Sequence, residues 1–149
     1  MFIPEGIQLY EVLPKQFYEE EYPTHGNRLW MMFDYELLLT VHHMRKRYGT
    51  VYLNNWYWGG DKQYRGWRPF HTTVGAYLSQ HKFGRAVDMV FKFYSAERIR
   101  NDILASPYST AFKFITGIEM EVSWVHIDVG NRYRHQSHLS KEVIQKIYP

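Results

Sequence analysis

The most informative stretch of the chain is Ser79-Gln80-His81-Lys82-Phe83-Gly84-Arg85-Ala86-Val87-Asp88. A second stretch, Trp124-Val125-His126-Ile127-Asp128-Val129-Gly130, supplies another histidine. Together, His81, Asp88 and His126 offer two imidazoles and one carboxylate. This is the ligand set of a catalytic zinc site, whose fourth coordination position stays open to water.

The spacing of these residues also indicates how the chain is folded around them. His81 and Asp88 are seven positions apart, a separation that does not place both on one face of a regular helix. It favours a ligand at the end of a loop, a tight turn through Gly84 and Ala86, and a second ligand on the following strand. We expect His126 to arrive from a neighbouring strand.

The fold class predicted for the whole chain is α+β, with helices packed against a small antiparallel sheet that carries the zinc site. Residues 1–149 are predicted to form one domain, in which residues 1–27 are an irregular lead with one short helix after Pro14. Asp34 and Ser95 are good helix N-caps, and Gly49 and Pro107 are helix terminators. The predicted helices are 35–48, 96–105 and 140–147, the predicted strands are 50–53, 86–93, 111–119 and 124–129, and a long loop covers 54–77.

Composition narrows the chemistry and the location. The chain has no cysteine, so any metal must be bound by His, Asp or Glu. No apolar run approaches the roughly 20 residues of a membrane-spanning helix, and the first residues lack the pattern of a signal peptide. These features predict a protein without a membrane span that is made in the cytoplasm.

Charge and aromatic content leave the partner open. The net charge is +3, the isoelectric point is about 9.0, and 18 % of the residues are aromatic. Aromatic rings stack on sugars and on bases alike. For Trp56, Trp58 and Trp67 core packing is the default, and a place in a glycan-facing cleft is the alternative. The small charge and the lack of a recognition motif count against a nucleic-acid partner.

A hydrolytic zinc site also needs a base, and two glutamates precede the last histidine. If residues 120–123 form the hairpin turn, Glu119 lies opposite Trp124 and shares a sheet face with His126. Glu121 then lies in the turn and is the reserve candidate. Asp128, two residues after His126, is predicted to orient one of the metal ligands without contacting the metal itself.

The motifs Ser79-x-His81-x-x-Gly84-x-Ala86-x-Asp88 and Trp124-x-His126-x-Asp128 resemble those of the M15 peptidase family. Its fold is shared by D-alanyl-D-alanine metallopeptidases and hedgehog signalling domains, and this chain resembles small phage-type members. The resemblance covers roughly residues 30–132. It implies a zinc enzyme, with one Zn²⁺ held by His81, Asp88 and His126, that cuts stem peptides of bacterial peptidoglycan. It also implies substrate binding by an upstream arginine, which is Arg68 here, with Arg65 as the reserve.

The chain departs from many relatives at the positions that hold the catalytic acid or a second histidine, where it has Ser123 and Trp124. Either Glu119 or Glu121 takes that role, or the protein is a noncatalytic, zinc-stabilised structural or wall-binding protein of a phage. An enzyme of this kind would reach the cell wall after release from the cytoplasm or as a component of the virion. The bond that is cut and the oligomeric state stay open.

Overall fold

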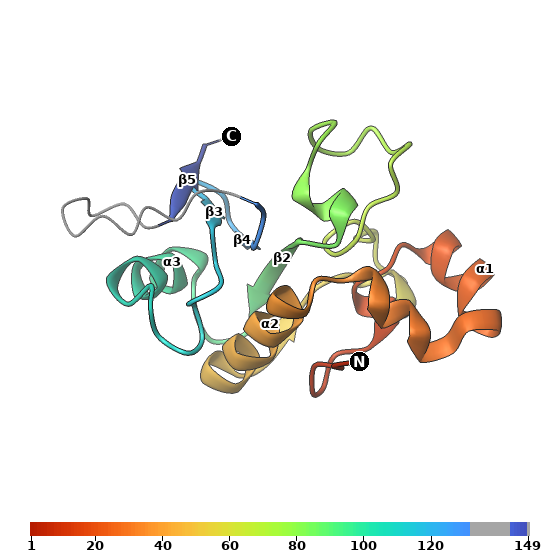
Figure 1. The fold of residues 1–149 in the computed structure, drawn as a ribbon, viewed down its shortest axis with the longest axis horizontal. Coiled ribbons are helices and arrows are strands. Elements are labelled where there is room, and N and C mark those ends of the chain that lie inside the picture. The colour runs from red at the N-terminus through yellow and green to blue at the C-terminus, as the bar shows by residue number, and fades with distance from the viewer. Residues whose placement is uncertain (132–143, 149) are drawn as a thin grey trace.

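The protein contains a five-stranded sheet in the order β1-β2-β4-β3-β5. The computed structural model describes residues 1–131 and 144–148 (Figure 1). The strands are β1 (Val51–Tyr52), β2 (Ala86–Phe91), β3 (Gly117–Glu119), β4 (Val125–Asp128) and β5 (Gln145–Ile147). Three neighbouring pairs are antiparallel, as predicted, but β3 and β5 run parallel. The sheet is therefore mixed, and the prediction of a purely antiparallel sheet was wrong.

The described residues form three α-helices, α1 (Lys15–His25), α2 (Tyr35–Tyr48) and α3 (Ala96–Ala105). The second and third have the predicted bounds, because their ends are set by local side chains. Asp34 accepts a hydrogen bond from the Glu36 amide at 2.9 Å, and Ser95 accepts one from the Arg98 amide at 3.2 Å. None of the helices in these parts of the chain is long and apolar enough to cross a bilayer.

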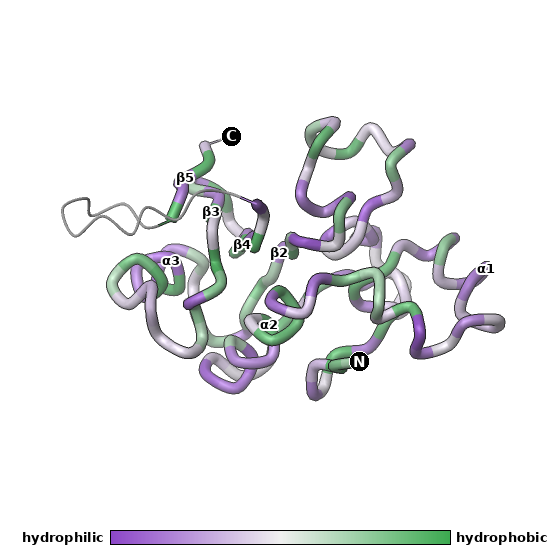
Figure 2. The backbone as a smooth tube through the Cα atoms, in the orientation of Figure 1, coloured by the Kyte–Doolittle hydropathy of each residue, from purple (hydrophilic) through white to green (hydrophobic). Residues whose placement is uncertain are grey.

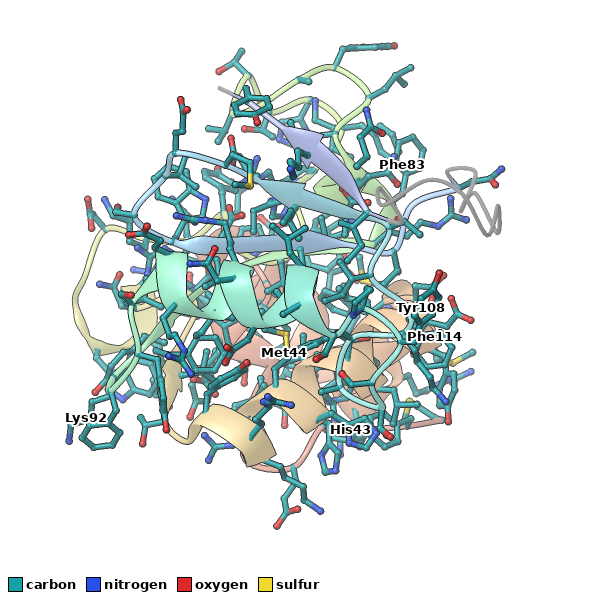
Figure 3. All side chains as sticks on the ribbon, turned by 90° about the vertical axis from the view of Figure 1, so that its left-hand side faces the viewer. His43, Met44, Phe83, Lys92, Tyr108 and Phe114 are labelled. Atoms are coloured by element: carbon teal, nitrogen blue, oxygen red, sulfur yellow. The ribbon has the colours of Figure 1, made fainter. Side chains whose placement is uncertain are left out.

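One face of the sheet packs on the helices and builds the core. Val87, Met89 and Phe91 of β2 alternate with Ala86, Asp88 and Val90, so the two sets project to opposite faces. The apolar set joins Ile127 of β4 and Ile118 of β3 in one cluster with α2 and α3. Figure 3 shows Met44, which is fully buried, on the side of α2 that faces α3. On β2 the opposite face carries Asp88 between Ala86 and Val90.

The N-terminal segment is more regular than the expected irregular lead. The short helix predicted after Pro14 is α1, and 3₁₀ turns at Leu9–Glu11 and Gly26–Met32 flank it. Ile7, Leu9, Val12 and Leu13 are buried in the core, which is why this segment is fixed to the rest of the chain. Figure 2 shows α1 as a largely hydrophilic helix, and none of its residues is buried.

Two predicted elements near the C-terminus were wrong. The strand expected at 111–119 is confined to 117–119, because the Ser109 carbonyl accepts hydrogen bonds from Phe112 and Lys113 and turns the chain. The helix expected at 140–147 is replaced at 145–147 by β5, whose backbone is satisfied by pairing with β3. Residues 140–143 of that predicted helix lie outside the described residues.

The turn between the first two candidate ligands requires glycine. The 3₁₀ helix Gln80–Phe83 ends at Gly84, which has a left-handed φ of 68°. A Cβ atom there would lie 2.0 Å from the Met32 carbonyl oxygen, closer than any real contact. Gly84 therefore lets the chain turn into β2 while it packs against the residues before α2.

We expect Gly84→Ala to destabilise the protein much more than Gly59→Ala. Both glycines have a positive φ, but nothing lies within 4 Å of a Cβ added at Gly59. Gly59→Ala should cost about 1–2 kcal/mol of backbone strain, and Gly84→Ala at least about 2 kcal/mol more, because of the clash. Chemical denaturation of both variants measures the difference, and equal losses would contradict the steric account.

Candidate metal centre

The polar face of the sheet brings three candidate residues into one row across three strands. Asp88 of β2 is paired with His126 of β4. On the other side of β4, Ile118 is paired with Ile127, so the next position along β3 places Glu119 beside His126. Residues directly opposite in a sheet have Cβ atoms about 4.5–5.5 Å apart. Strand register alone therefore sets Asp88, His126 and Glu119 side by side.

His81 joins this row from outside the sheet. It belongs to the 3₁₀ helix before β2, and its side chain is almost completely buried. Its Nδ1 lies 2.7 Å from the carbonyl oxygen of Gly66. Because a carbonyl oxygen can only accept, Nδ1 carries the proton and Nε2 presents its lone pair to Asp88 and His126.

The distances between the three ligand atoms fit a small metal ion. His81 Nε2 lies 3.3 Å from His126 Nδ1 and 3.4 Å from Asp88 Oδ1, and His126 Nδ1 lies 2.7 Å from Asp88 Oδ1. Tetrahedral bonds of about 2.0–2.2 Å to zinc imply ligand separations of about 3.3–3.6 Å. The two separations that involve His81 lie within this range. The shorter third separation, between His126 and Asp88, is a hydrogen bond that a metal would replace. These residues could hold a metal ion.

Charge at this cluster favours a cation. Burial alone would raise the pKa of Asp88, but His81 and His126 outweigh it and hold that pKa well below its usual range. Burial lowers the pKa of His81 and keeps its imidazole neutral. For His126 burial acts in the same direction, but the carboxylates of Asp128 and Asp88 outweigh it and raise its pKa to about 9. At neutral pH a proton on His126 thus occupies the place that a metal would take.

Asp128 lies behind His126, as predicted for an orienting residue. Its Oδ2 lies 3.7 Å from His126 Nε2, the ring nitrogen that faces away from Asp88. Its Oδ1 accepts hydrogen bonds from the Thr116 hydroxyl and the Gly130 amide, both at 3.1 Å. This buried carboxylate is therefore held in place, and it favours the ring orientation in which Nδ1 points at the centre.

Of the two candidate arginines, only Arg68 lines the cavity over the centre. Its Nη2 donates to Asp88 Oδ2 at 2.8 Å, and its Nε donates to the Tyr64 carbonyl oxygen at 2.6 Å. The sequence indicated Arg68 as a substrate-binding residue but gave no sign of its bond to a candidate ligand. The reserve residue, Arg65, donates instead to the Leu53 carbonyl oxygen at 3.1 Å and is absent from the cavity lining within the described residues.

The two candidate bases, Glu119 and Glu121, lie in different environments. Glu119 lines the cavity, and its charge acts on the pKa of Arg68. Glu121 is exposed in the turn, with a φ of 60°. The predicted pairing of Glu119 with Trp124 was wrong by two residues. Because side chains alternate with a period of two, this error leaves Glu119 on the expected face.

The cavity over the centre has a volume of about 460 Å³. Besides the candidate residues, its lining includes Trp124, Gln80, Ile147 and residues of the 74–79 loop. Sequence reasoning gave none of these a role in the site. Trp124 could have been found, since it lies two positions before His126 on the same strand face. Ile147 could not, because its position depends on the pairing of β5 with β3.

We expect the protein to bind one zinc ion per chain, with an apparent affinity that falls as the pH is lowered. Binding through Nδ1 requires loss of a proton from His126, whose pKa is about 9. Below that pH, the affinity should fall about tenfold per pH unit, and it should level off above it. Competition with a chelator of known proton affinity at several pH values measures this slope.

The matched variants for this measurement are His81→Ala, which should abolish binding, and His25→Ala on α1, which should leave it unchanged. An affinity that does not vary between about pH 6.5 and 8.5 would contradict the assigned coordination through His126.

No family model, curated protein or solved structure matches the chain. Two imidazole nitrogens and one carboxylate oxygen converge at the wall of a cavity that also contains a second carboxylate and a guanidinium group. Such a set suits metal-assisted hydrolysis of a polar bond.

Proposed function

We propose that the protein is a zinc-dependent peptidase that cleaves stem peptides of bacterial peptidoglycan. One observation carries the proposal: the ligand atoms of His81, Asp88 and His126 converge within a cavity that Glu119 and Arg68 also line. Three protein ligands and an open fourth position are typical of catalytic rather than structural zinc sites.

The three ligands would hold zinc through His81 Nε2, Asp88 Oδ1 and His126 Nδ1. In such sites zinc lowers the pKa of bound water from 15.7 to roughly 7 and polarises the carbonyl group under attack. The protein's own contribution is a rigid set of ligands. The Gly66 carbonyl fixes His81, Arg68 fixes the second oxygen of Asp88, and Asp128 orients His126.

Glu119 is the proposed general base. It neighbours His126 in the row across the sheet and faces the same cavity, so its carboxylate is close to where an attacking water would be activated. In this role it accepts a proton from water and passes it to the amine that leaves when the peptide bond breaks. Its position on a strand, rather than in the turn, puts its side chain on the sheet face that carries Asp88 and His126.

Arg68 is proposed to stabilise negative charge on the substrate. Asp88 and the Tyr64 carbonyl accept hydrogen bonds from two of its N–H groups, which fixes the guanidinium plane, and a guanidinium group has five such donors in all. A fixed guanidinium beside the cavity suits a substrate carboxylate or the oxyanion of the transition state. Because Arg68 also holds Asp88, its removal would affect metal binding as well as turnover.

The peptidoglycan substrate rests on the resemblance of the two motifs to those of the M15 peptidases. A cavity of about 460 Å³ is within the size range of sites for small ligands, which suits a few residues of a stem peptide. We propose that the protein meets this substrate after release from the cytoplasm or as a component of a phage particle.

Digestion of purified peptidoglycan by the zinc-loaded protein tests the proposal directly. We expect soluble peptide fragments, identified by mass spectrometry, that a chelator prevents and added zinc restores. The masses of the fragments would identify the bond that is cut. Bound zinc with an intact wall would overturn the proposal in favour of a noncatalytic, zinc-stabilised structural or wall-binding protein.

We expect Glu119→Gln to retain zinc but to lower kcat by about 10²–10⁴-fold, because the amide cannot accept the proton. Glu121→Gln is the matched control and should keep both zinc and activity, since Glu121 is exposed in the turn. Zinc content and the rate of fragment release are measured on the same samples. Full activity of Glu119→Gln would eliminate Glu119 as the base.

A further inference from the structure

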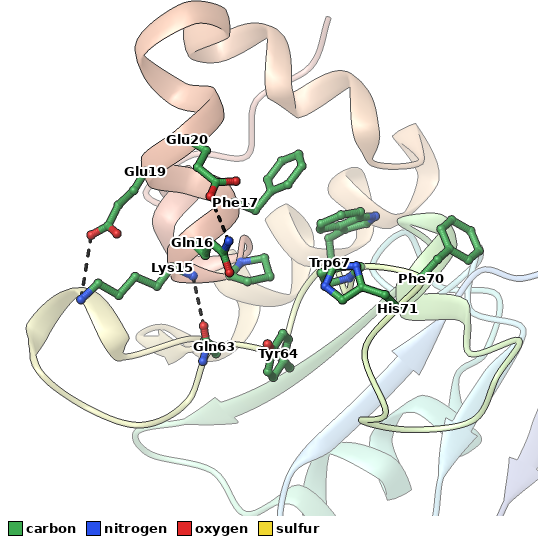
Figure 4. A pocket seen from close by; sticks show the side chains of 12 residues that line it. Lys15, Gln16, Phe17, Glu19, Glu20, Gln63, Tyr64, Trp67, Phe70 and His71 are labelled. Atoms are coloured by element: carbon green, nitrogen blue, oxygen red, sulfur yellow. Dashed lines mark hydrogen bonds and ion pairs between the residues drawn. The ribbon is translucent and has the colours of Figure 1, made fainter.

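A second cavity, of about 570 Å³, is lined by Trp67 and Pro69, the two neighbours of Arg68 in the chain. It is formed by the start of α1 and by residues 63–71, as Figure 4 shows. In that view Gln16, Gln63 and Tyr64 lie on one side of the space, and Trp67, Phe70 and His71 lie on the other. No residue of the metal centre lines this cavity.

One short segment forms a wall of both cavities. Trp67 lines the second cavity, and its neighbour Arg68 lines the cavity over the metal centre. The segment is held rigidly, since the Trp67 amide donates to the Val12 carbonyl at 2.8 Å and the Gly66 carbonyl accepts from His81. A polymeric ligand that lies across this segment could therefore contact both cavities.

The second cavity has an aromatic wall. The ring of Trp67 is half-buried and packs against Phe17 with centroids 4.6 Å apart. Aromatic faces carry partial negative charge and attract the C–H groups of a ligand. The apolar face of a pyranose ring presents such C–H groups, and its hydroxyl groups project around the rim.

The rim of the cavity supplies both donors and acceptors. Gln16 donates to Glu20 at 2.9 Å, and the Gln63 side-chain oxygen accepts from the Lys15 amide at 3.3 Å. Each of these amides and the Glu20 carboxylate has further hydrogen-bonding capacity. Hydroxyl and acetamido groups, which both donate and accept, match a rim of this kind.

The charge of the lining argues against a polyanion. Glu19 and Glu20 outnumber Lys15, which itself lies 3.9 Å from Glu19. A nucleic acid or another phosphate polymer would require a positive surface. The lining therefore favours an uncharged ligand with polar groups around an apolar face.

We propose that this second cavity is a saccharide-binding subsite, with Trp67 as its stacking platform and Gln16, Gln63 and Glu20 as its hydrogen-bonding rim. Its ligand is an uncharged oligosaccharide of N-acetylated sugars. In the peptidase, the subsite would bind the glycan strand next to the stem peptide, and this extension rests on the proposed function. Binding of the oligosaccharide itself does not depend on the proposed function.

Titration with chitotetraose tests the subsite, because this probe contains no peptide bond and its binding does not depend on hydrolysis. We expect saturable shifts of the NMR signals of residues that line the cavity, including the Trp67 indole N–H, in spectra of the protein. Trp67→Ala should weaken binding at least tenfold, and Trp67→Phe should restore most of it. Trp58→Ala removes a tryptophan that is 63 % exposed and outside this cavity, so it should change nothing.

Two variants at the exposed rim, Gln16→Ala and Glu20→Ala, keep the test decisive if Trp67→Ala fails to fold. Each should weaken chitotetraose binding several-fold while the melting temperature stays unchanged. No saturable shift up to about 20 mM probe, or equal binding by the Trp67→Ala and Trp58→Ala variants, would overturn the proposal. Shifts of the same NMR signals on addition of trilysine, but not on addition of chitotetraose, would also overturn the proposal. That result would indicate that the cavity binds a cationic peptide.

The outcome is separable from that of the peptidase assay. Chitotetraose binding by a protein that leaves peptidoglycan intact would support the subsite and overturn the proposed function. Chelator-sensitive peptide release without chitotetraose binding would support the proposed function and overturn the saccharide subsite.

Discussion

The carboxylate of Asp88 connects parts of the chain that are far apart in sequence. One oxygen lies beside the imidazoles of His81 and His126, and the other accepts a hydrogen bond from Arg68. A buried carboxylate is costly unless its partners are well placed, so the fold must bring the 3₁₀ helix before β2, the β4 strand and the loop of Arg68 together. The geometry of the candidate centre follows from this requirement.

The segment Gly66–Arg68 is a second constraint on the candidate centre, because each of its three residues has a separate role in the structure. The Gly66 carbonyl fixes the tautomer of His81, Trp67 lines the second cavity, and Arg68 holds Asp88. A Cβ at position 66 would lie 2.2 Å from the Val12 carbonyl oxygen, so only glycine allows this close approach. The N-terminal segment thus supports the candidate metal centre through Val12, although it contributes no candidate ligand.

The two proposals use different properties of this arrangement. The peptidase proposal depends on ligand geometry and on carboxylates whose positions are set by strand register and hydrogen bonds. The saccharide proposal depends on an aromatic face and a nearly neutral polar rim. Because Trp67 and Arg68 are adjacent in the chain, one rigid segment forms part of the wall of both proposed sites.

Local sequence determined the elements that are controlled by neighbouring residues. Asp34 and Ser95 set the starts of α2 and α3, and Gly84 with its flanking residues predicted the turn into β2. The residue types of His81, Asp88 and His126, and the small residues at fixed positions between the first two, indicated a metal-binding cluster, because two imidazoles and a carboxylate are the ligand set of a catalytic zinc site. Alternation along the hairpin placed Glu119 on the correct face even though its predicted partner was two residues away.

Other features depended on contacts between distant parts of the chain. The parallel pairing of β5 with β3, the bond between Arg68 and Asp88, and the burial of the N-terminal segment leave no local pattern in the sequence. At the second cavity Phe17 of α1 packs against Trp67, about fifty positions later, and Gln16 of α1 joins the lining. Short-range propensities fix helix ends and strand faces. Register, ion-pair partners and cavities are fixed only when separate segments pack against one another, and that is decided by the tertiary structure.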